Sequence, residues 1–351
     1  MKRCIAFLFF NLYFLFSFAC STFLLSKNGQ YFFGRNYDWV TGNGMVMVNK
    51  RGLQKTSFNV DEGKEISWTS SCGSITFNQY GKEFPNGGMN EKGLVVELMW
   101  LSEAVYPEPD ERASLHVLQW IQYQLDNCAT VAEVIATDKI IRISNASSVP
   151  LHYLVADATG DVSTIEFLKG KMVVHRGKDL SFPVLTNTVY EQAAQQIQEK
   201  KGSQNFSDNS VDRFATACRM VQQYRLENNS QQPVDYAFTI LDKVAQGNFT
   251  KWRIVYDISN RQIHFLTNEH PERKTLAFNQ FDFSCNQPGL ALDINDKVKG
   301  AVFTRFTPLT FTDNKGLITR SLQESRQELN IPSSAITKAE AYFDTPTCSV
   351  H

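Results

Sequence analysis

The sequence has almost no excess of charge of either sign, since 35 Lys and Arg residues stand against 36 Asp and Glu residues, a formal net charge of −1. A balance this even gives no indication of a nucleic-acid partner. After residue 19, no apolar run is long enough to span a bilayer. The cysteines form no Cys-x-x-Cys pair, so no zinc site is indicated and we expect no metal or other cofactor.

The N-terminal segment, by contrast, has the pattern of a secretory signal peptide over residues 1–19. A basic start is followed by an apolar stretch over residues 5–16 and by Ser17-Phe18-Ala19, which has small residues at the −3 and −1 positions. Cleavage there makes Cys20 the first residue of one domain spanning 20–351, exported to the periplasm or secreted from a bacterium. Two alternatives stay open: Cys20 is the lipidated residue of a membrane-tethered binding lipoprotein, or it is a structural cysteine.

A cysteine at a processed N-terminus carries two reactive groups, a thiol and a free α-amine. An unperturbed thiol has a pKa of about 8.5 and an α-amine one of about 7.7 to 8. The amine of Cys20 can therefore accept the thiol proton near neutral pH, and no histidine is needed as a base. Lipidation would acylate this amine and remove the base, so the enzyme and the lipoprotein exclude one another.

The residues after Cys20 predict a β-hairpin. A strand-like run over residues 21–26 leads to the turn dipeptide Asn28-Gly29, and an aromatic run begins the return strand. Antiparallel pairing across this turn places Cys20 opposite residues 36–38. Arg35 and Asp38 then lie beside the new N-terminus, where a guanidinium favours a thiolate and a carboxylate holds an amine. If they did not lie beside Cys20, Arg35 and Asp38 would be interpreted as a solvent-exposed ion pair at the surface.

Two polar residues further along are ambiguous on local evidence alone. Asn187 ends a short extended piece, where asparagine is usually a turn former. Arg213 falls in the first turn of a helix for which Ser210 is the expected N-cap, and the helix dipole disfavours a cation there. A negative group near Arg213 would offset that cost, although local pairing at the surface would do the same.

The remaining pattern is that of an α+β protein with helices layered on sheets. Residues 87–93 read as a turn before an apolar strand with one glutamate, Glu97. Helices are expected at 114–125, 130–135, from 193, 210–224, 235–245, 321–329 and 334–342, and strands at 94–101, 152–155, 162–168, 172–175, 184–187, 252–258 and 262–267. There are seven cysteines: Cys4, Cys20, Cys72, Cys128, Cys218, Cys285 and Cys348. With Cys4 lost and Cys20 free, at least one more must be an unpaired thiol, which we expect to be buried.

Several blocks in register resemble the choloylglycine hydrolase family, which comprises bile salt hydrolases and penicillin V acylases. They are GRNYDW from Gly34, GMNEKGL from Gly88, the turn at 157–160, VLTN ending at Asn187 and DRF around Arg213. The resemblance implies an N-terminal-nucleophile hydrolase, an αββα four-layer sandwich that cleaves linear amide C–N bonds of small N-acylated molecules. Relatives are often tetramers, so a homo-tetramer is an expectation as well.

The resemblance also implies a role for each candidate residue. Cys20 is the expected nucleophile, with its own amine as base, and Arg35 and Asp38 hold and polarise the two groups. Asn187 donates its side-chain amide to the oxyanion, together with the backbone N–H of Trp100. Arg213 completes the charged network.

Trp100 departs from the pattern of the bile salt hydrolases, which usually have an asparagine there. With Trp39, directly after Asp38, it predicts an aromatic acyl pocket similar to that of the Gram-negative penicillin V acylases, relatives that also take long-chain acyl homoserine lactones. Conjugated bile salts are the alternative substrates. For each tryptophan alone, core packing is the plainer interpretation.

Overall fold

The computed structural model describes residues 20–58, 60–146, 149–199, 209–226 and 231–349, so the expected signal peptide lies outside the described residues. Most of the described strands belong to two sheets. The seven-stranded sheet has the order β14 (Val184–Leu185), β1 (Ser21–Lys27), β2 (Gln30–Asp38), β15 (Thr250–Asp257), β16 (Gln262–Thr267), β17 (Lys274–Ala277) and β19 (Gly300–Ala301). The nine-stranded sheet has the order β13 (Lys171–Arg176), β12 (Val162–Leu168), β11 (Leu151–Ala156), β8 (Val95–Trp100), β7 (Pro85–Asn90), β6 (Ser74–Asn78), β3 (Met45–Asn49), β18 (Leu290–Asp293) and β20 (Thr307–Pro308).

Smaller sheets and seven helices complete the described part of the chain. The smaller sheets are β9 (Ala113–Leu115) with β10 (Ile141–Ile143), and β21 (Thr347–Cys348) with β4 (Leu53–Thr56) and β5 (Ser67–Thr69). The helices are α1 (Val117–Asn127), α2 (Val131–Ala136), α3 (Tyr190–Glu199), α4 (Asn209–Leu226), α5 (Pro233–Lys243), α6 (Phe311–Glu324) and α7 (Ser333–Ala341).

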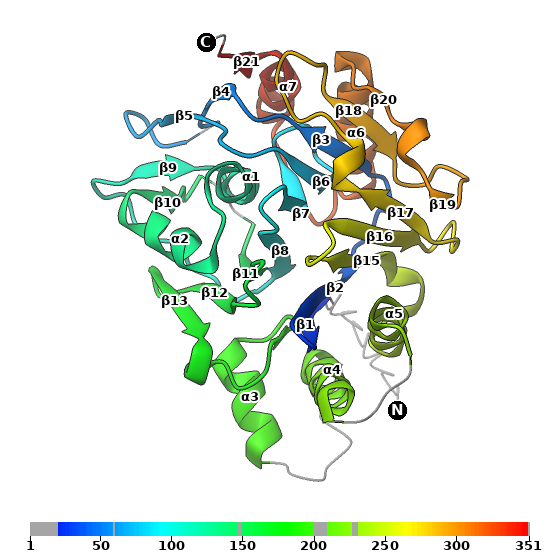
Figure 1. The fold of residues 1–351 in the computed structure, drawn as a ribbon. Helices are drawn as coiled ribbons and strands as arrows, with labels where there is room; N and C mark the ends of the chain where they lie inside the picture. The colour runs from blue at the N-terminus through cyan, green and yellow to red at the C-terminus, as the bar shows by residue number, and fades with distance from the viewer. Residues whose placement is uncertain (1–19, 59, 147–148, 200–208, 227–230, 350–351) are drawn as a thin grey trace, which may run out of the picture.

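The two large sheets pack face to face and carry helices on their outer sides. One continuous apolar core contains buried residues of both sheets, among them Phe33 and Val255 of the first and Ile75 and Val95 of the second. Helices α4 and α5 pack on β1, β2 and β15, whereas α1 packs on β7 and β8. Figure 1 shows α4 and α5 on one side of the molecule and α1 on the other, with β1 and β2 between them. The architecture is the expected α+β sandwich of four layers, αββα.

Several expected helix starts are wrong. The helix expected from residue 114 begins only at Val117, because residues 113–115 form strand β9 and the His116 side chain caps the helix. Helix α6 begins at Phe311, ten residues before the predicted start, because Thr310 and Asp313 form a capping box there. Helix α4 begins at Asn209, so Ser210 lies inside it and is not its N-cap. The Ser210 hydroxyl instead accepts a hydrogen bond from the backbone N–H of Asn187, 2.9 Å away, and so ties α4 to the end of β14.

The glycine-rich segment at 87–93 is only partly the predicted turn. Its first half is strand β7, and the turn occupies the residues after Asn90, with Gly93 at φ +87°. Gly87 pairs with Glu97 on the neighbouring strand β8. A β-carbon at position 87 would overlap the carboxylate of Glu97, so this glycine provides space within a strand.

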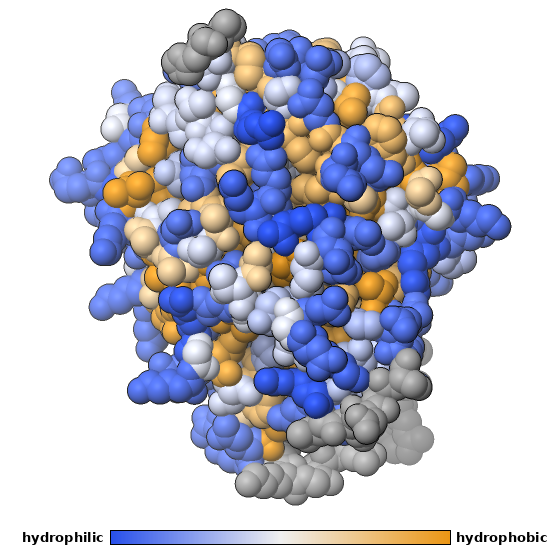
Figure 2. Space-filling model, in the orientation of Figure 1, coloured by the Kyte–Doolittle hydropathy of each residue, from blue (hydrophilic) through white to orange (hydrophobic). Residues whose placement is uncertain are grey.

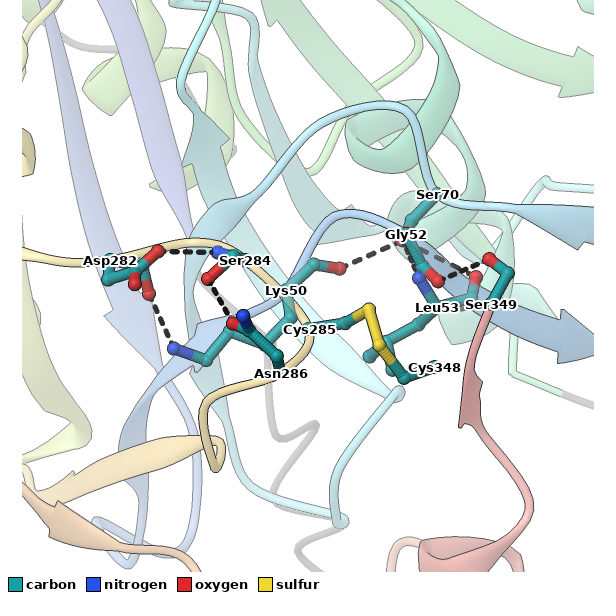
Figure 3. Close-up of a disulfide and its surroundings, with 10 residues drawn as sticks. All are labelled: Lys50, Gly52, Leu53, Ser70, Asp282, Ser284, Cys285, Asn286, Cys348 and Ser349. Atoms are coloured by element: carbon teal, nitrogen blue, oxygen red, sulfur yellow. Dashed lines mark hydrogen bonds between the residues drawn. A yellow bond between two sulfur atoms is a disulfide. The ribbon is translucent and has the colours of Figure 1, made fainter. Parts of the chain in front are cut away.

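One disulfide joins Cys285 to Cys348 across a sequence separation of 63 residues. It fastens the C-terminal strand β21 to the loop after β17, and Ser349 donates hydrogen bonds from its N–H and hydroxyl to the carbonyl of Gly52 (Figure 3). The other described cysteines, Cys20, Cys72, Cys128 and Cys218, are free and buried, which confirms the expectation of buried unpaired thiols.

The outer surface is mostly polar on the face drawn in Figure 2, where hydrophilic residues break up the apolar ones into small patches. Within the described residues, no helix has both the length and the apolar character required to cross a membrane.

Candidate active site

Cys20 lies at the start of the first strand of the predicted hairpin. The register pairs Ser21 with Asn36 and Thr22 with Arg35, so Cys20 stands opposite the Tyr37–Asp38 end of β2, as expected from the sequence. Cys20 is only 4% exposed, and its Sγ lies 3.8 Å from the backbone oxygen of Asp38. Burial raises the pKa of the Cys20 thiol to about 11, although the nearby Arg35 guanidinium acts in the opposite direction.

Arg35 is fully buried beside Cys20 and is held there by residues of β8 and β15. Its Nε forms an ion pair with the Glu97 carboxylate, and its Nη2 donates to the backbone oxygen of Leu98 at 3.0 Å. The other carboxylate oxygen of Glu97 accepts a hydrogen bond from the hydroxyl of Tyr256. Burial disfavours the charged guanidinium, but the Glu97 carboxylate together with Cys20, Tyr37 and Tyr256 outweighs burial, so the pKa of Arg35 is raised.

Glu97 and Tyr256 were not among the predicted site residues. The available signal was a single acidic residue inside an apolar strand, because a buried carboxylate needs a partner. Burial raises the pKa of Glu97 to about 7, against the opposing effects of Arg35 and the Tyr256 hydroxyl.

Asp38 is 1% exposed and has one carboxylate oxygen engaged. Its Oδ1 accepts a hydrogen bond from the hydroxyl of Thr250, the residue opposite it on β15. Its Oδ2 has no hydrogen-bond partner among the described residues. Burial raises the pKa of Asp38 to about 7, even though the bond from Thr250 and the charge of Arg213 act to lower it. The free oxygen of a buried carboxylate is a ready acceptor for a nearby cationic group.

Arg213 links α4 to the nucleophile and to Asn187. Its Nη1 donates to the backbone oxygen of Cys20 at 2.6 Å and to the hydroxyl of Ser21 at 2.7 Å, and its Nε donates to Asn209 at 3.0 Å. Its Nη2 donates to the side-chain oxygen of Asn187 at 3.1 Å. These acceptors account for a guanidinium in the first turn of a helix, where the dipole opposes it.

The contact with Arg213 fixes the orientation of the Asn187 amide. Because Oδ1 faces Arg213, Nδ2 faces β8, where one of its two hydrogens is donated to the backbone oxygen of Trp100 at 2.8 Å. The N–H of the next residue, Leu101, donates to the backbone oxygen of Pro150 and so points to the β11 side of β8. Since backbone groups alternate along a strand, the N–H of Trp100 faces the side of Asn187.

The two tryptophans stack on one another in a cavity of about 300 Å³ that also reaches Cys20. The ring centroids of Trp39 and Trp100 are 6.1 Å apart, at an interplanar angle of 29°. The Trp39 Nε1–H is donated to the hydroxyl of Tyr80 at 2.7 Å, and that of Trp100 to Ser102 at 3.3 Å. Each indole thus presents apolar surface to the cavity while its N–H group is engaged by a hydroxyl.

Little charge faces this cavity apart from Asp38. His116 lines it, and burial lowers the pKa of this histidine to about 4, so the ring is neutral near pH 7. Asn86 also lines it, is 2% exposed, and has a side-chain nitrogen with no hydrogen-bond partner in the described structure. Among the described residues, no three His, Cys, Asp or Glu side chains are grouped so that they could hold a metal ion.

Residues 20–291 match the family model described as linear amide C–N hydrolases, choloylglycine hydrolase family. The chain belongs to the choloylglycine hydrolase family. A curated relative, the penicillin V acylase of Pectobacterium atrosepticum, is 34% identical over 138 residues, which are 35% of this chain and 36% of that enzyme. The match therefore spans about a third of the relative's length.

Solved structures of the family share the fold over most of the chain. The penicillin V acylase of Agrobacterium tumefaciens superposes with a TM-score of 0.72 at 25% identity, covering 83% of this chain and 98% of that one. A conjugated bile acid hydrolase of Clostridium perfringens superposes with a TM-score of 0.67 at 17% identity, covering 80% and 98%. The second likeness is one of fold alone.

Proposed function

We propose that the protein hydrolyses the linear amide bond of an N-acylated small molecule, with Cys20 as the nucleophile after removal of residues 1–19. The observation that carries this proposal is that Arg35, Asp38, Asn187 and Arg213 gather around Cys20, which lines an apolar cavity together with Asp38. Acyl transfer to a cysteine requires an activated thiol and a donor for the oxyanion, and the guanidinium, carboxylate and amide groups around Cys20 are suited to these roles.

In the proposed first step, the α-amine of Cys20 takes the proton of its own thiol. The resulting ammonium donates to the free Oδ2 of Asp38, which has no other partner in the described structure. A cation there stabilises the Asp38 carboxylate, and together with Arg35 it also favours the thiolate. While residue 19 is still attached, Cys20 has no free amine, and burial keeps its thiol protonated.

The thiolate then attacks the carbonyl carbon and forms a C–S bond, and the carbonyl oxygen becomes an oxyanion. The second hydrogen on Nδ2 of Asn187 and the backbone N–H of Trp100 are its donors. Collapse of this intermediate breaks the C–N bond, and the departing amine takes the proton from the Cys20 ammonium. Water then attacks the thioester carbonyl and gives a proton to the α-amine of Cys20. The C–S bond breaks, which releases the acid and restores the Cys20 thiolate.

The cavity favours an aromatic or aliphatic acyl group. Stacked Trp39 and Trp100 form its wall beside the nucleophile, and two relatives are penicillin V acylases. We therefore propose a penicillin V acylase-like specificity that extends to acyl homoserine lactones. An exported, periplasmic or secreted protein and a homo-tetramer remain part of the proposal, and the disulfide between Cys285 and Cys348 is consistent with an oxidising compartment.

The test is amine release by protein that starts at Cys20, with Cys20→Ala as the control. Penicillin V, dodecanoyl homoserine lactone and glycocholate are offered separately. We expect turnover of the first two and none by the Ala variant. Preference for glycocholate would show instead that the protein is a bile salt hydrolase. No turnover of any substrate, with diacylglycerol found on Cys20 by intact mass, would establish the lipoprotein instead.

A further inference from the structure

The cavity at Cys20 extends to residues that lie after the family-matched region. The match ends at residue 291, yet nine later residues also line the cavity. Five of them are apolar residues in helix α7 or just before it, and we call these five the C-terminal wall: Leu329, Ile331, Ala335, Ile336 and Ala339. The last three belong to α7, and the first two to the segment that leads into it.

Helix α7 turns its apolar side to the cavity and not to the protein core. Ala335, Ile336 and Ala339 follow the i, i+1, i+4 spacing of one helix face, and each is half-buried. No residue of α7 itself is fully buried. A helix whose apolar side borders a cavity gains burial when an apolar ligand fills that cavity.

The C-terminal wall is held in place at the end of α7. Tyr342, directly after the helix, is 7% exposed and packs edge to face on Phe58, at a centroid distance of 5.3 Å. Its hydroxyl accepts a hydrogen bond from Gln119 Nε2 at 2.7 Å and donates to the backbone oxygen of Thr56. Strand β21 then pairs with β4, and the disulfide fastens β21 to the loop before β18. Figure 1 draws α7 and β21 in red, at the C-terminal end of the chain.

We propose that the C-terminal wall contacts the distal end of a straight acyl chain and thereby sets the longest chain that the enzyme accepts. This inference rests on the proposed function, in which the acyl carbonyl lies at Cys20. Trp39 and Trp100 contact the part of the acyl group next to the carbonyl, and Ile336 and Ala339 contact its end.

The C-terminal wall predicts that kcat/KM rises with acyl chain length up to a limiting length and then stops rising or falls. We call this limiting length the break. Each methylene that becomes buried raises kcat/KM about fourfold, which corresponds to about 0.8 kcal/mol. Once the chain reaches α7, a further methylene gains nothing or clashes. The measurement is amine release from acyl homoserine lactones in steps from butanoyl to dodecanoyl, with penicillin V as a substrate with a short acyl group.

Three variants locate the break. Ala339→Leu fills the end of the cavity and is expected to move the break about two methylenes shorter, with an about 15-fold loss on the longest good substrate. Ile336→Ala moves the break to longer chains. Ala341→Leu is the matched control, because Ala341 is exposed on the same helix and does not line the cavity. The control Ala341→Leu is expected to leave turnover of penicillin V within twofold of the wild-type value.

The proposal is overturned if Ala339→Leu changes kcat/KM for every chain length by the same factor, or for none. A wild-type protein that releases no amine from any of these substrates refutes the proposed function itself. Circular dichroism and melting temperatures show whether each variant is folded, and Ile336→Ala, which only removes atoms, still tests the wall if Ala339→Leu does not fold.

Discussion

Replacing Asn187 with alanine tests the oxyanion site with little effect on the fold. The change removes a donor that the tetrahedral intermediate needs more than the ground state does. Loss of one such donor costs about 2.7 to 4 kcal/mol in the transition state, which is about 10²- to 10³-fold in kcat. We expect KM to change much less, since the uncharged carbonyl binds that donor weakly.

The structure explains why stability should be preserved. Asn187→Ala leaves Arg213 without one of its acceptors, but that guanidinium keeps its bonds to Cys20, Ser21 and Asn209. The hydrogen bond to the backbone oxygen of Trp100 is lost as well. Two such losses amount to about 1 to 3 kcal/mol. The melting temperature should fall by a few degrees, and the protein should remain folded at 25 °C.

The assay is steady-state amine release from penicillin V, with Asn295→Ala as the matched control. Asn295 also donates its amide to a carbonyl, that of Gly42 at 3.0 Å, but does not line the cavity. Its variant should retain wild-type kcat. A loss in kcat below fivefold for Asn187→Ala would refute the oxyanion role, and an equal loss in the control would attribute the effect to general destabilisation.

Three further perturbations address the supporting structure. Glu97→Gln leaves the Arg35 guanidinium buried without a counter-charge and should lower the free energy of unfolding by about 3 kcal/mol or more, measured by urea titration. A change below about 1 kcal/mol would contradict a stabilising ion pair between the two residues. Replacing both Cys285 and Cys348 with serine opens a loop of 63 residues and should lower the free energy of unfolding by about 4 kcal/mol, because the unfolded chain gains conformational entropy. The melting temperature should then fall by about 5 to 10 °C, and an unchanged melting temperature would contradict a stabilising role of the disulfide. In protein with an uncleavable extension before Cys20, burial raises the pKa of Asp38 to about 7, above its unfolded value. Asp38 by itself then binds one more proton in the folded state than in the unfolded state between about pH 4 and 7. It therefore makes stability fall with rising pH by about 1.4 kcal/mol per unit, and Asp38→Asn should remove that part of the slope.

The sequence predicted the part of the site that depends on local structure. One turn at Asn28-Gly29 sets the register of β1 and β2, and that register alone brings Arg35 and Asp38 to Cys20. No distant contact has to be known for that inference. The signal peptide and the extent of the domain remain predictions.

The residues that sequence analysis missed lie on strands far away in the chain. Thr250 reaches Asp38, and Tyr256 reaches Glu97, through the pairing of β15 with β2 and the packing of the two sheets. Propensity and periodicity do not specify which distant strand is the neighbour. The family resemblance implied that Asn187 and Arg213 belong to the site, but it did not predict their contact with each other, and neither residue had a local signal that decided its role.

The space left by Gly87 makes two positions ten residues apart interdependent. Any side chain at position 87 would displace the Glu97 carboxylate, and with it the guanidinium of Arg35 beside the thiol. A substitution at this glycine would thus act on Cys20 without touching it. Anyone who redesigns strand β7 or compares distant relatives should therefore treat Gly87 and Glu97 as one unit, in which a larger residue at the first position requires a smaller one at the second.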